Sequence, residues 1–422
     1  MLLGLIATVS LLVSRPGVPN QEMNWPQFRG PLGDGISRNT GLPSTWSETD
    51  HVKWKTPIHG KGWSSPVLWG NQVWLTTATD DGHQMYAICV NRATGKVLLD
   101  TKLFDNPNPE PLGNDVNSYG SPSPAIEDGC VYIHFGSYGT AAIDTKTFKT
   151  LWTRRDLPCR HYRGPSSSPI IFRNLLILTF DGADYQYTAA LDKKTGKTVW
   201  KTDRSANWND LDSQGHVTAE GDNRKAHSTP IIREIGGKPQ LISPGAKAAY
   251  GYDPVTGKEV WKVDHFGVSC STMPTMGHGF IYFNSGYGRP DLVAVKVGGT
   301  GNITNTHVAW KYSRNVPSKP SPLLIDDSIY MLQDGGVFTC INAKTGEEQW
   351  KERIGGNYAS SPLYVEGRIY CFSEQGKTII LKPGPKFEKI GETTLSDGFM
   401  ATPAIAGSDF YLRTKSALYR VE

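Results

Sequence analysis

The stretch that decides the fold reads Ala190-Leu-Asp-Lys-Lys-Thr-Gly-Lys-Thr-Val-Trp200. A near copy reads Gly251-Tyr-Asp-Pro-Val-Thr-Gly-Lys-Glu-Val-Trp261, and weaker forms run over 90–96 and 341–346. An Asp or Asn that opens a turn can cap backbone N–H groups, and the glycine supplies a positive φ. Each copy therefore predicts a strand, a tight turn and a second strand, in which an aromatic residue recurs at Trp152, Trp200, Trp261, Trp310 and Trp350.

A second signature, a small hydroxyl residue before a proline, recurs along the chain. Its copies are Ser65-Pro66, Ser123-Pro124, Ser168-Pro169, Thr229-Pro230, Ser321-Pro322, Ser361-Pro362 and Thr402-Pro403, and Met273-Pro274 is a copy without the hydroxyl. In seven copies an apolar residue stands seven positions after the proline and opens an apolar run, with turn residues in between. This spacing predicts a strand, a tight turn and a second strand.

Together the two signatures define a repeat of four antiparallel strands, which is typical of a propeller blade. Eight copies predict an all-β, eight-bladed β-propeller over residues 51–422. The last copy ends after its third strand, whereas the segment His51–Lys55 matches a fourth strand and precedes the first copy. We therefore expect an N-terminal strand to complete the last blade and remove the open sheet edges.

The rest of the chain divides around this ring. Residues 1–23 include an apolar run, Met1–Val13, which predicts a signal peptide and export to the periplasm, the cell surface or the medium. Residues 24–50 are expected to form an ordered leader that packs on the outside of the propeller. Two long inserts, 104–120 and 203–227, connect consecutive blades and are expected on one face beside the central channel, where loops often carry function.

Composition limits the classes of partner. The chain has 44 basic and 40 acidic residues without a basic run, which argues against nucleic acid and against a charged membrane surface. No apolar stretch is long enough to span a bilayer, and no coiled-coil segment suggests an oligomer, so we expect a monomer. The six cysteines contain no C-x-x-C or Cys-Cys pair, and both disulfides and buried free thiols remain open.

The repeats resemble the PQQ-like (pyrroloquinoline-quinone-like) propeller family over roughly residues 51–422. Two groups share this blade: quinoprotein dehydrogenases of alcohols or sugars, and the propeller lipoprotein of the outer-membrane assembly machinery, which binds no cofactor. The layout also resembles stand-alone propellers of planctomycete-like bacteria, which open with Trp-Pro-x-Phe-Arg-Gly, as residues 25–30 do here. The chain lacks the adjacent cysteines of many of the dehydrogenases and the anchoring cysteine of the lipoprotein.

Known chemical motifs are sparse. The segment Asp210-x-Asp212-x-Gln214-Gly215 approaches a calcium loop, but Gln214 and Gly221 occupy positions that need acidic or amide ligands. No haem, zinc-helix or nucleophile-elbow motif occurs. We therefore predict no metal site and no established cofactor; PQQ with calcium is compatible with the fold but is supported neither by adjacent cysteines nor by a calcium motif.

The candidate site is the rim of the channel, formed by residues just before each inner strand. The candidate cofactor- or ligand-binding residues are Trp63, Asn117, Tyr119, His161, Arg163, His227, Lys319 and Tyr358, with Lys225, Asn357, Phe399 and Met400 beside them. Aromatic, basic and amide groups around one axis suit a planar or anionic ligand.

Three hypotheses follow for the function. The first is an exported, non-catalytic binding or scaffold protein that uses the loop-bearing face to hold envelope proteins or a small anionic ligand. The second is a PQQ-dependent dehydrogenase of alcohols or sugars, in which the cofactor carries the redox chemistry. The third is a carbohydrate-binding propeller, suggested by the 12 tryptophans.

Overall fold

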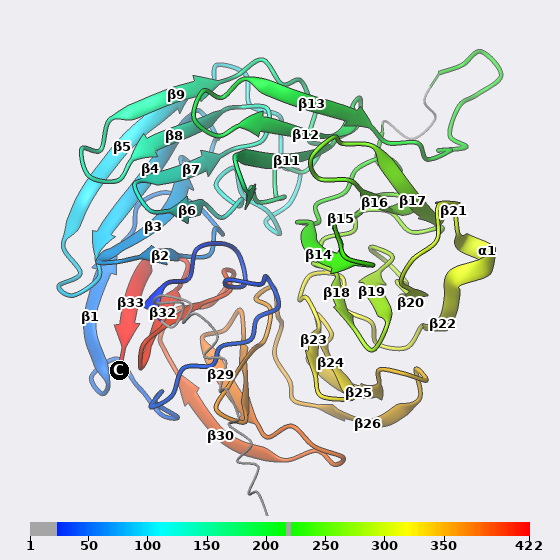
Figure 1. The fold of residues 1–422 in the computed structure, drawn as a ribbon. Helices are drawn as coiled ribbons and strands as arrows, with labels where there is room; N and C mark the ends of the chain where they lie inside the picture. The colour runs from blue at the N-terminus through cyan, green and yellow to red at the C-terminus, as the bar shows by residue number, and fades with distance from the viewer. Residues whose placement is uncertain (1–22, 217–220) are drawn as a thin grey trace, which may run out of the picture.

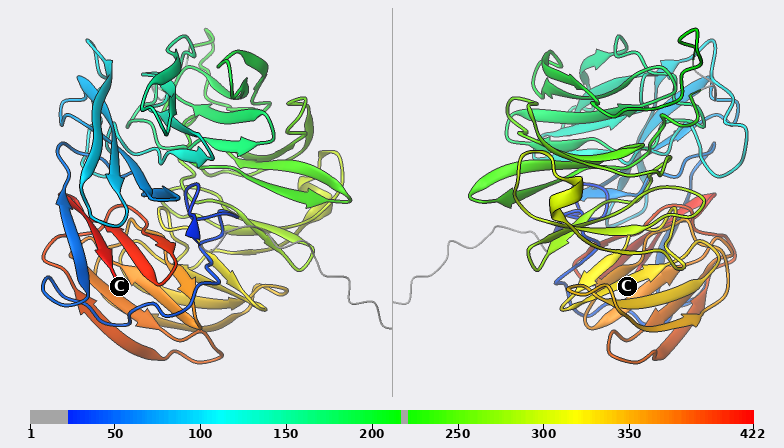
Figure 2. Two further views of the ribbon diagram at one scale, coloured as in Figure 1. Left: turned by 60° about the vertical axis from the view of Figure 1, so that its left-hand side comes forward. Right: turned by 90° about the vertical axis from the view of Figure 1, so that its right-hand side faces the viewer.

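The computed structural model describes residues 23–216 and 221–422 and shows eight antiparallel sheets arranged around a ring (Figures 1 and 2). The predicted all-β, eight-bladed propeller is thereby confirmed. Each blade has four antiparallel strands, and these are consecutive in the chain except in blades 5 and 8. The predicted signal peptide lies outside the described residues except for Met23, so it stays a prediction.

The first four blades follow the chain in order. Blade 1 contains β2 (Val67–Trp69), β3 (Gln72–Ala78), β4 (Gln84–Asn91) and β5 (Val97–Asp105), and blade 2 contains β6 (Ala125–Glu127), β7 (Cys130–His134), β8 (Thr140–Asp144) and β9 (Thr150–Arg154). Blade 3 contains β10 (Ile170–Phe172), β11 (Leu175–Asp181), β12 (Gln186–Asp192) and β13 (Thr198–Asp203). Blade 4 contains β14 (Ile231–Ile235), β15 (Lys238–Pro244), β16 (Ala248–Tyr252) and β17 (Glu259–Asp264).

The other blades complete the circle. Blade 5 contains β18 (Thr275–Gly277), β19 (Phe280–Asn284), β20 (Leu292–Lys296) and β22 (Val308–Tyr312), and blade 6 contains β23 (Leu323–Ile325), β24 (Ser328–Leu332), β25 (Val337–Asn342) and β26 (Glu348–Arg353). Blade 7 contains β27 (Leu363–Val365), β28 (Arg368–Phe372), β29 (Lys377–Leu381) and β30 (Lys389–Thr394). Blade 8 contains β31 (Ala404–Ala406), β32 (Asp409–Arg413), β33 (Ala417–Val421) and β1 (Val52–Pro57).

One connection departs from the repeat. Between β20 and β22 the chain forms β21 (Gly301–Asn302) and the short helix α1 (Thr304–His307). Strand β21 pairs in parallel with β17 and adds a fifth strand to the outer edge of blade 4. The sequence does not predict this additional strand, because the connection carries neither repeat signature.

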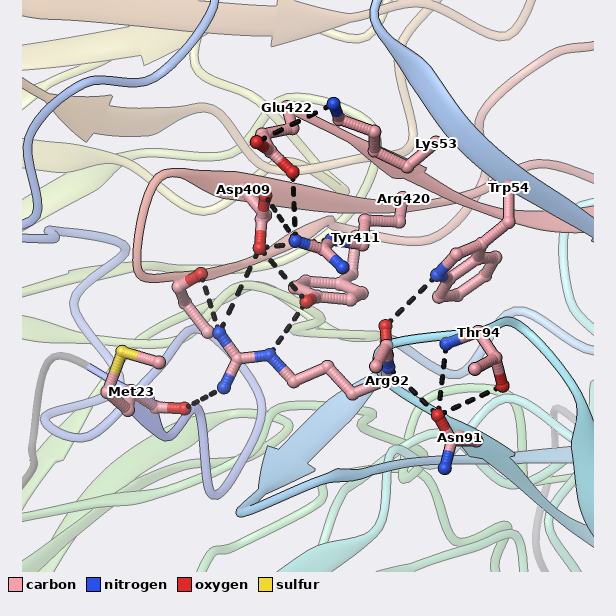
Figure 3. Close-up of polar contacts among 12 residues, drawn as sticks. Met23, Lys53, Trp54, Asn91, Arg92, Thr94, Asp409, Tyr411, Arg420 and Glu422 are labelled. Atoms are coloured by element: carbon pink, nitrogen blue, oxygen red, sulfur yellow. Dashed lines mark hydrogen bonds and ion pairs between the residues drawn. The ribbon is translucent and has the colours of Figure 1, made fainter.

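Ring closure occurs between the two ends of the chain, as the sequence predicts. Strand β1 pairs antiparallel with β33, so blade 8 takes its outer strand from the N-terminal side. Polar contacts tie this seam to blade 1: Arg92 donates from Nε to the Tyr411 hydroxyl at 2.7 Å and from Nη1 to the carbonyl of Met23 at 2.9 Å (Figure 3). Arg92 therefore links blade 1, blade 8 and the start of the leader.

Trp261 donates to Oε1 of Gln240 within its own blade, whereas five other tryptophans join consecutive blades. Each of these five donates from its indole Nε1 to a carbonyl in the outer turn of the next blade, in the pairs Trp54–Arg92, Trp152–Lys193, Trp200–Pro254, Trp310–Lys344 and Trp350–Gly384 at 2.9–3.1 Å. In that turn the position of the glycine matters, because a Cβ on Gly196 would lie 2.8 Å from the Trp152 ring. Glycine there allows both the positive φ of the turn and the close approach of the indole.

The hydroxyl residues before the prolines join the blades nearer the channel. The hydroxyl of one copy accepts a hydrogen bond from the backbone N–H of the preceding copy at 2.8–3.0 Å, in the pairs Ser65–Ser123, Ser123–Ser168, Ser168–Thr229, Met273–Ser321, Ser321–Ser361 and Ser361–Thr402. We call this set the hydroxyl ring. Met273 has no hydroxyl and therefore interrupts the ring after Thr229.

The core is distributed over the packed faces between blades. Inner strands such as β11 are buried along their whole length, whereas outer strands such as β1 alternate between exposed and less exposed residues. All six cysteines are free thiols, and the most buried of them have no exposed surface. Burial raises the pKa of the Cys89 thiol because it disfavours the thiolate. No helix in the described part of the chain is both long and apolar enough to cross a membrane.

The leader packs on the propeller, but it crosses the channel axis instead of staying on the outside (Figure 1). Trp25 exchanges two backbone hydrogen bonds with Leu68 of blade 1, and Ser37 donates to the carbonyl of Tyr364 in blade 7. Between them, Arg29 donates to the carbonyl of Pro322 in blade 6 at 2.9 Å. The leader thus lies over the end of the channel where the turns between first and second strands meet.

Candidate functional site

A cavity of about 590 Å³ lies along the channel and is lined from the loop-bearing face. Both long inserts reach it: the first supplies Asn114, Val116 and Asn117, and the second supplies Asp222, Lys225 and His227. Each insert connects the fourth strand of one blade to the first strand of the next, and this position brings it to the cavity, as predicted from the sequence. Hydroxyls dominate the remaining lining: Ser65, Ser121, Ser123, Ser166, Ser168, Thr229, Ser269, Ser271, Ser318, Ser361 and Thr402.

The leader and the hydroxyl ring line the end of the cavity that lies away from the loop-bearing face. Phe28 of the leader is part of the lining, together with six members of the hydroxyl ring. The leader covers one end of the channel. At the other end, on the loop-bearing face, residues of the inserts and loops surround the cavity.

Arg163 is placed in the cavity by the first insert. A Cβ on Gly113 would lie 1.7 Å from Nη1 of Arg163, so the guanidinium occupies the space beside this glycine, whose φ is +71°. Nη1 donates to the carbonyl of Leu112 at 3.3 Å. Within the described residues Arg163 forms no ion pair, which leaves most of its donors available to a ligand.

Lys225 and His227 belong to the second insert and line the same cavity as Arg163. Burial and the charge of Arg163 lower the pKa of Lys225 to about 8, while Asp222 forms an ion pair with the same ammonium group. Burial, followed by the charge of Lys225, lowers the pKa of His227 to about 3. The imidazole is therefore neutral at physiological pH and can offer one donor and one acceptor.

Lys319 stands on the other side of the cavity and is already paired. Its Nζ donates to Oε1 of Glu374 at 2.9 Å. Asp334 accepts the backbone N–H groups of Ser318 at 2.8 Å and Lys319 at 3.2 Å, so its carboxylate holds this loop. Lys319 therefore adds less net charge to the cavity than Arg163 does.

Trp63 and Asn117 have different roles in the lining. The amide Nδ2 of Asn117 donates to the carbonyl of Arg163 at 2.7 Å and to Oγ of Ser166 at 2.9 Å, while Oδ1 accepts from Ser121. Asn117 therefore positions the loop that carries Arg163. The indole N–H of Trp63 is buried without a hydrogen-bond partner, and Lys61 lies 5.6 Å above its ring.

The structure brings five of the eight candidates into the lining: Trp63, Asn117, Arg163, His227 and Lys319. Tyr119, His161 and Tyr358 lie behind it. The hydroxyl of Tyr119 donates to the carbonyl of Glu110, and Tyr358 has no exposed surface and packs in a hydrophobic cluster. Nε2 of His161 accepts the backbone N–H of Ser137 at 2.8 Å, and burial lowers the pKa of His161 to about 4.

Of the neighbouring residues that the sequence analysis named, Lys225 and Met400 line the cavity, whereas Asn357 and Phe399 do not. Sequence reasoning missed Phe28, Asp222, Tyr287 and Asp334. Two of these, Tyr287 and Asp334, belong to connections between second and third strands. These connections open on the same face, and counting strands along the repeat could have found them.

The lining does not fit a quinone bridged to the protein by a divalent cation. The carboxylate of Asp222 is paired with Lys225, and that of Asp334 accepts hydrogen bonds from two backbone N–H groups. The amide of Asn117 donates to the carbonyl of Arg163 in the neighbouring loop. Among the described residues no group of three or more His, Cys, Asp or Glu side chains is arranged to hold a metal ion. Calcium prefers six or more oxygen ligands, which these side chains do not offer together.

Comparisons with curated proteins give distant relatives. The chain is 23% identical to the outer membrane protein assembly factor BamB of Yersinia pestis over 231 residues, which are 46% of this chain and 58% of that protein. It is 26% identical to the tetrathionate hydrolase of Acidianus ambivalens over 155 residues, which are 30% of this chain and 29% of that protein. The chain thus matches less than two thirds of the length of each of these relatives.

Solved structures share the fold at low identity. BamB from Moraxella catarrhalis superposes with a TM-score of 0.59 and 13% identity, covering 88% of this chain and 99% of that one. The quinohemoprotein alcohol dehydrogenase from Comamonas testosteroni gives 0.67 and 12%, covering 94% and 80%. A family model described as outer membrane protein assembly factor BamB matches residues 45–220, 186–324 and 249–384. The chain belongs to this family of PQQ-like propellers.

Proposed function

We propose that the chain is an exported, non-catalytic binding protein of the cell envelope that holds a partner protein on its loop-bearing face. The observation that carries this proposal is the asymmetry of the channel. The leader covers one end, while the other presents a cavity whose cation Arg163 has no acidic partner among the described residues. Functional groups on loops of a rigid scaffold are a common arrangement in binding proteins.

The family supports this function. The matching model and the Yersinia pestis relative are both described as an outer membrane protein assembly factor, a role performed among other envelope proteins. We accordingly propose location in the periplasm or at the cell surface, reached through the N-terminal signal peptide.

A quinone-dependent dehydrogenase is less well supported, because the carboxylates of Asp222 and Asp334 in the lining already contact an ammonium group and backbone N–H groups. A carbohydrate-binding role is also less well supported. Of the 12 tryptophans, Trp63 lines the cavity, whereas five hold consecutive blades together through their indole N–H groups. Stacking on a sugar would therefore depend largely on Trp63.

The proposal is tested by photo-crosslinking in the native envelope. A photoreactive residue replaces Asn114, which is exposed in the first insert, and in a control variant it replaces Asp128, which is exposed in the turn between β6 and β7 at the leader side. We expect a discrete crosslinked protein for the Asn114 variant alone. Equal crosslinking from both positions, or turnover of alcohols by the purified protein with PQQ and calcium, would contradict the proposal.

A further inference from the structure

Two cations that line the cavity, Arg163 and Lys225, share one aromatic ring. The guanidinium carbon of Arg163 and the ammonium nitrogen of Lys225 each lie 5.0 Å from the centroid of the Tyr162 ring. Asp222 neutralises Lys225, but within the described chain no carboxylate pairs with Arg163. Because Arg163 keeps its charge without an acidic partner, an anion bound beside it gains a favourable charge interaction.

The neighbouring groups suit a carboxylate. A guanidinium with free donors binds a carboxylate through two parallel hydrogen bonds. The imidazole of His227 lines the same cavity and adds no competing charge, because burial keeps it neutral. The hydroxyls of Thr229 and Ser269 line the cavity as well and supply further polar contacts.

Two exposed aromatic side chains belong to chain segments that line the cavity or directly precede the lining. Phe266 is 95% exposed and Tyr287 is 72% exposed, the largest values among the exposed hydrophobic side chains of the described residues. The backbone N–H of Tyr287 donates to the carbonyl of Val268, and both Val268 and Tyr287 line the cavity. Tyr287 therefore carries apolar surface from the cavity lining to solvent, and Phe266 stands two residues before the lining residue Val268. The ligand that fits both features is an acidic group on a longer chain.

We propose that Arg163, Lys225 and His227 form a carboxylate site for an Asp or Glu side chain of an extended segment of a partner protein. Apolar residues beside that acidic residue pack on Phe266 and Tyr287. This inference rests on the proposed function, because it names the chemistry by which the loop-bearing face holds its partner.

The first experiment identifies the peptide chemistry. A display library of random nine-residue peptides is selected on the immobilised mature chain, and the selected sequences are compared with the unselected library. We expect enrichment of Asp or Glu at one position, flanked by aromatic or aliphatic residues. Selected peptides without an acidic position, or no selected peptides at all, would overturn the proposal.

The second experiment assigns the site by fluorescence anisotropy with the best selected peptide. Loss of a charge-assisted bidentate contact in a partly exposed cavity is expected to lower affinity about 10- to 100-fold in Arg163→Ala. Arg163→Lys should recover part of the affinity because it keeps the charge. The matched control is Arg173→Ala, since Arg173 is an exposed arginine stacked on Phe172, outside the cavity lining, and should leave affinity unchanged.

Three results separate the possible sources of failure. Replacing the acidic residue of the peptide by its amide should reduce binding to wild type but not further reduce binding to Arg163→Ala; additive losses would contradict the carboxylate–arginine contact. The double substitution Phe266→Ser with Tyr287→Ser should also weaken binding of the peptide, because it removes the apolar contacts beside the acidic residue. Both side chains are exposed, so the fold should not depend on them. If the protein bound malonate but no acidic peptide, the ligand would be a free small carboxylate, and the proposal would be overturned. A crosslink at Asn114 in that case would leave the proposed function standing.

Discussion

Two arginines, one at each end of the channel, show how differently the two faces of this propeller are built. Arg29 in the leader is completely buried and donates from Nη2 to the carbonyls of Asp34 at 2.8 Å and Pro322 at 2.9 Å. Arg163 at the loop-bearing face is half-buried, and its Nη1 donates to the carbonyl of Leu112 at 3.3 Å. Burial lowers the pKa of Arg29 to about 10, which reflects how thoroughly water is removed from that side chain.

The difference shows that the chain's own residues fill the leader face, whereas the loop-bearing face keeps the groups that the proposed partner would contact. At the leader face, aromatic side chains such as Trp25 and Trp46 are buried, and Glu366 accepts the backbone N–H groups of Gly41 and Leu42. At the loop-bearing face, Arg163 lacks an acidic partner among the described residues and Phe266 is almost fully exposed. Changes at the first face should therefore affect stability, and changes at the second should affect binding.

The largest expected effect comes from the leader. Trp25 is 2% exposed and packs over Gly30, so Trp25→Ala should lower the free energy of unfolding by about 3–5 kcal/mol. Urea denaturation followed by circular dichroism measures this loss. The matched change at the other face is Trp63→Ala, which should cost clearly less because Trp63 is only half-buried. Equal losses would remove the distinction between the faces.

The hydroxyl ring, which lies between the two faces, should show a smaller effect. Ser321→Ala removes the acceptor for the buried N–H of Met273 and should cost about 1–3 kcal/mol in urea denaturation. The control is Ser318→Ala in the cavity lining, which should change stability by no more than about 0.5 kcal/mol. A neutral Ser321→Ala would mean that the ring does not hold the blades together.

The anchorage of the leader should also depend on acidity. Partial burial would raise the pKa of Glu48, but hydrogen bonds from Ser396 and Lys55 outweigh it and lower that pKa to about 2. Since an unfolded glutamate titrates near about 4.3, the carboxylate stabilises the folded state above that pH, and the contribution is lost as pH falls toward 2. The stability gap between wild type and Glu48→Gln should therefore shrink from pH 6 to pH 3; a constant gap would contradict this anchor.

The fold was predictable because its information is local and repeated. The turn over 192–197 and the Ser-Pro copies each specify contacts with the next blade, namely the Trp152 indole and the hydroxyl of the next copy. Strand β21 was not predictable, because its pairing with β17 bridges two blades and leaves no repeated signature. The path of the leader across the axis was missed for a similar reason: its contacts are with several blades that are distant in sequence.

The candidate site was predictable only in part. The position of a residue before an inner strand indicates its face, and this was enough to bring Arg163 and His227 to the cavity. It does not indicate which way the side chain turns. Tyr358 turns into the core and His161 turns to the N–H of Ser137, and both orientations depend on the packing of neighbouring loops.

The central claim, that the leader face supplies stability and the loop-bearing face supplies binding, is tested most directly by the unfolding free energies of Arg29→Ala and Arg163→Ala. Arg29→Ala leaves two carbonyls without their donor and opens a buried space, so we expect a loss of about 2–4 kcal/mol. Arg163→Ala removes a side chain without an ion pair and relieves its repulsion with Lys225, so stability should stay within about 1 kcal/mol of wild type. A loss in Arg163→Ala as large as that in Arg29→Ala would show that Arg163 is a structural residue and would contradict the account.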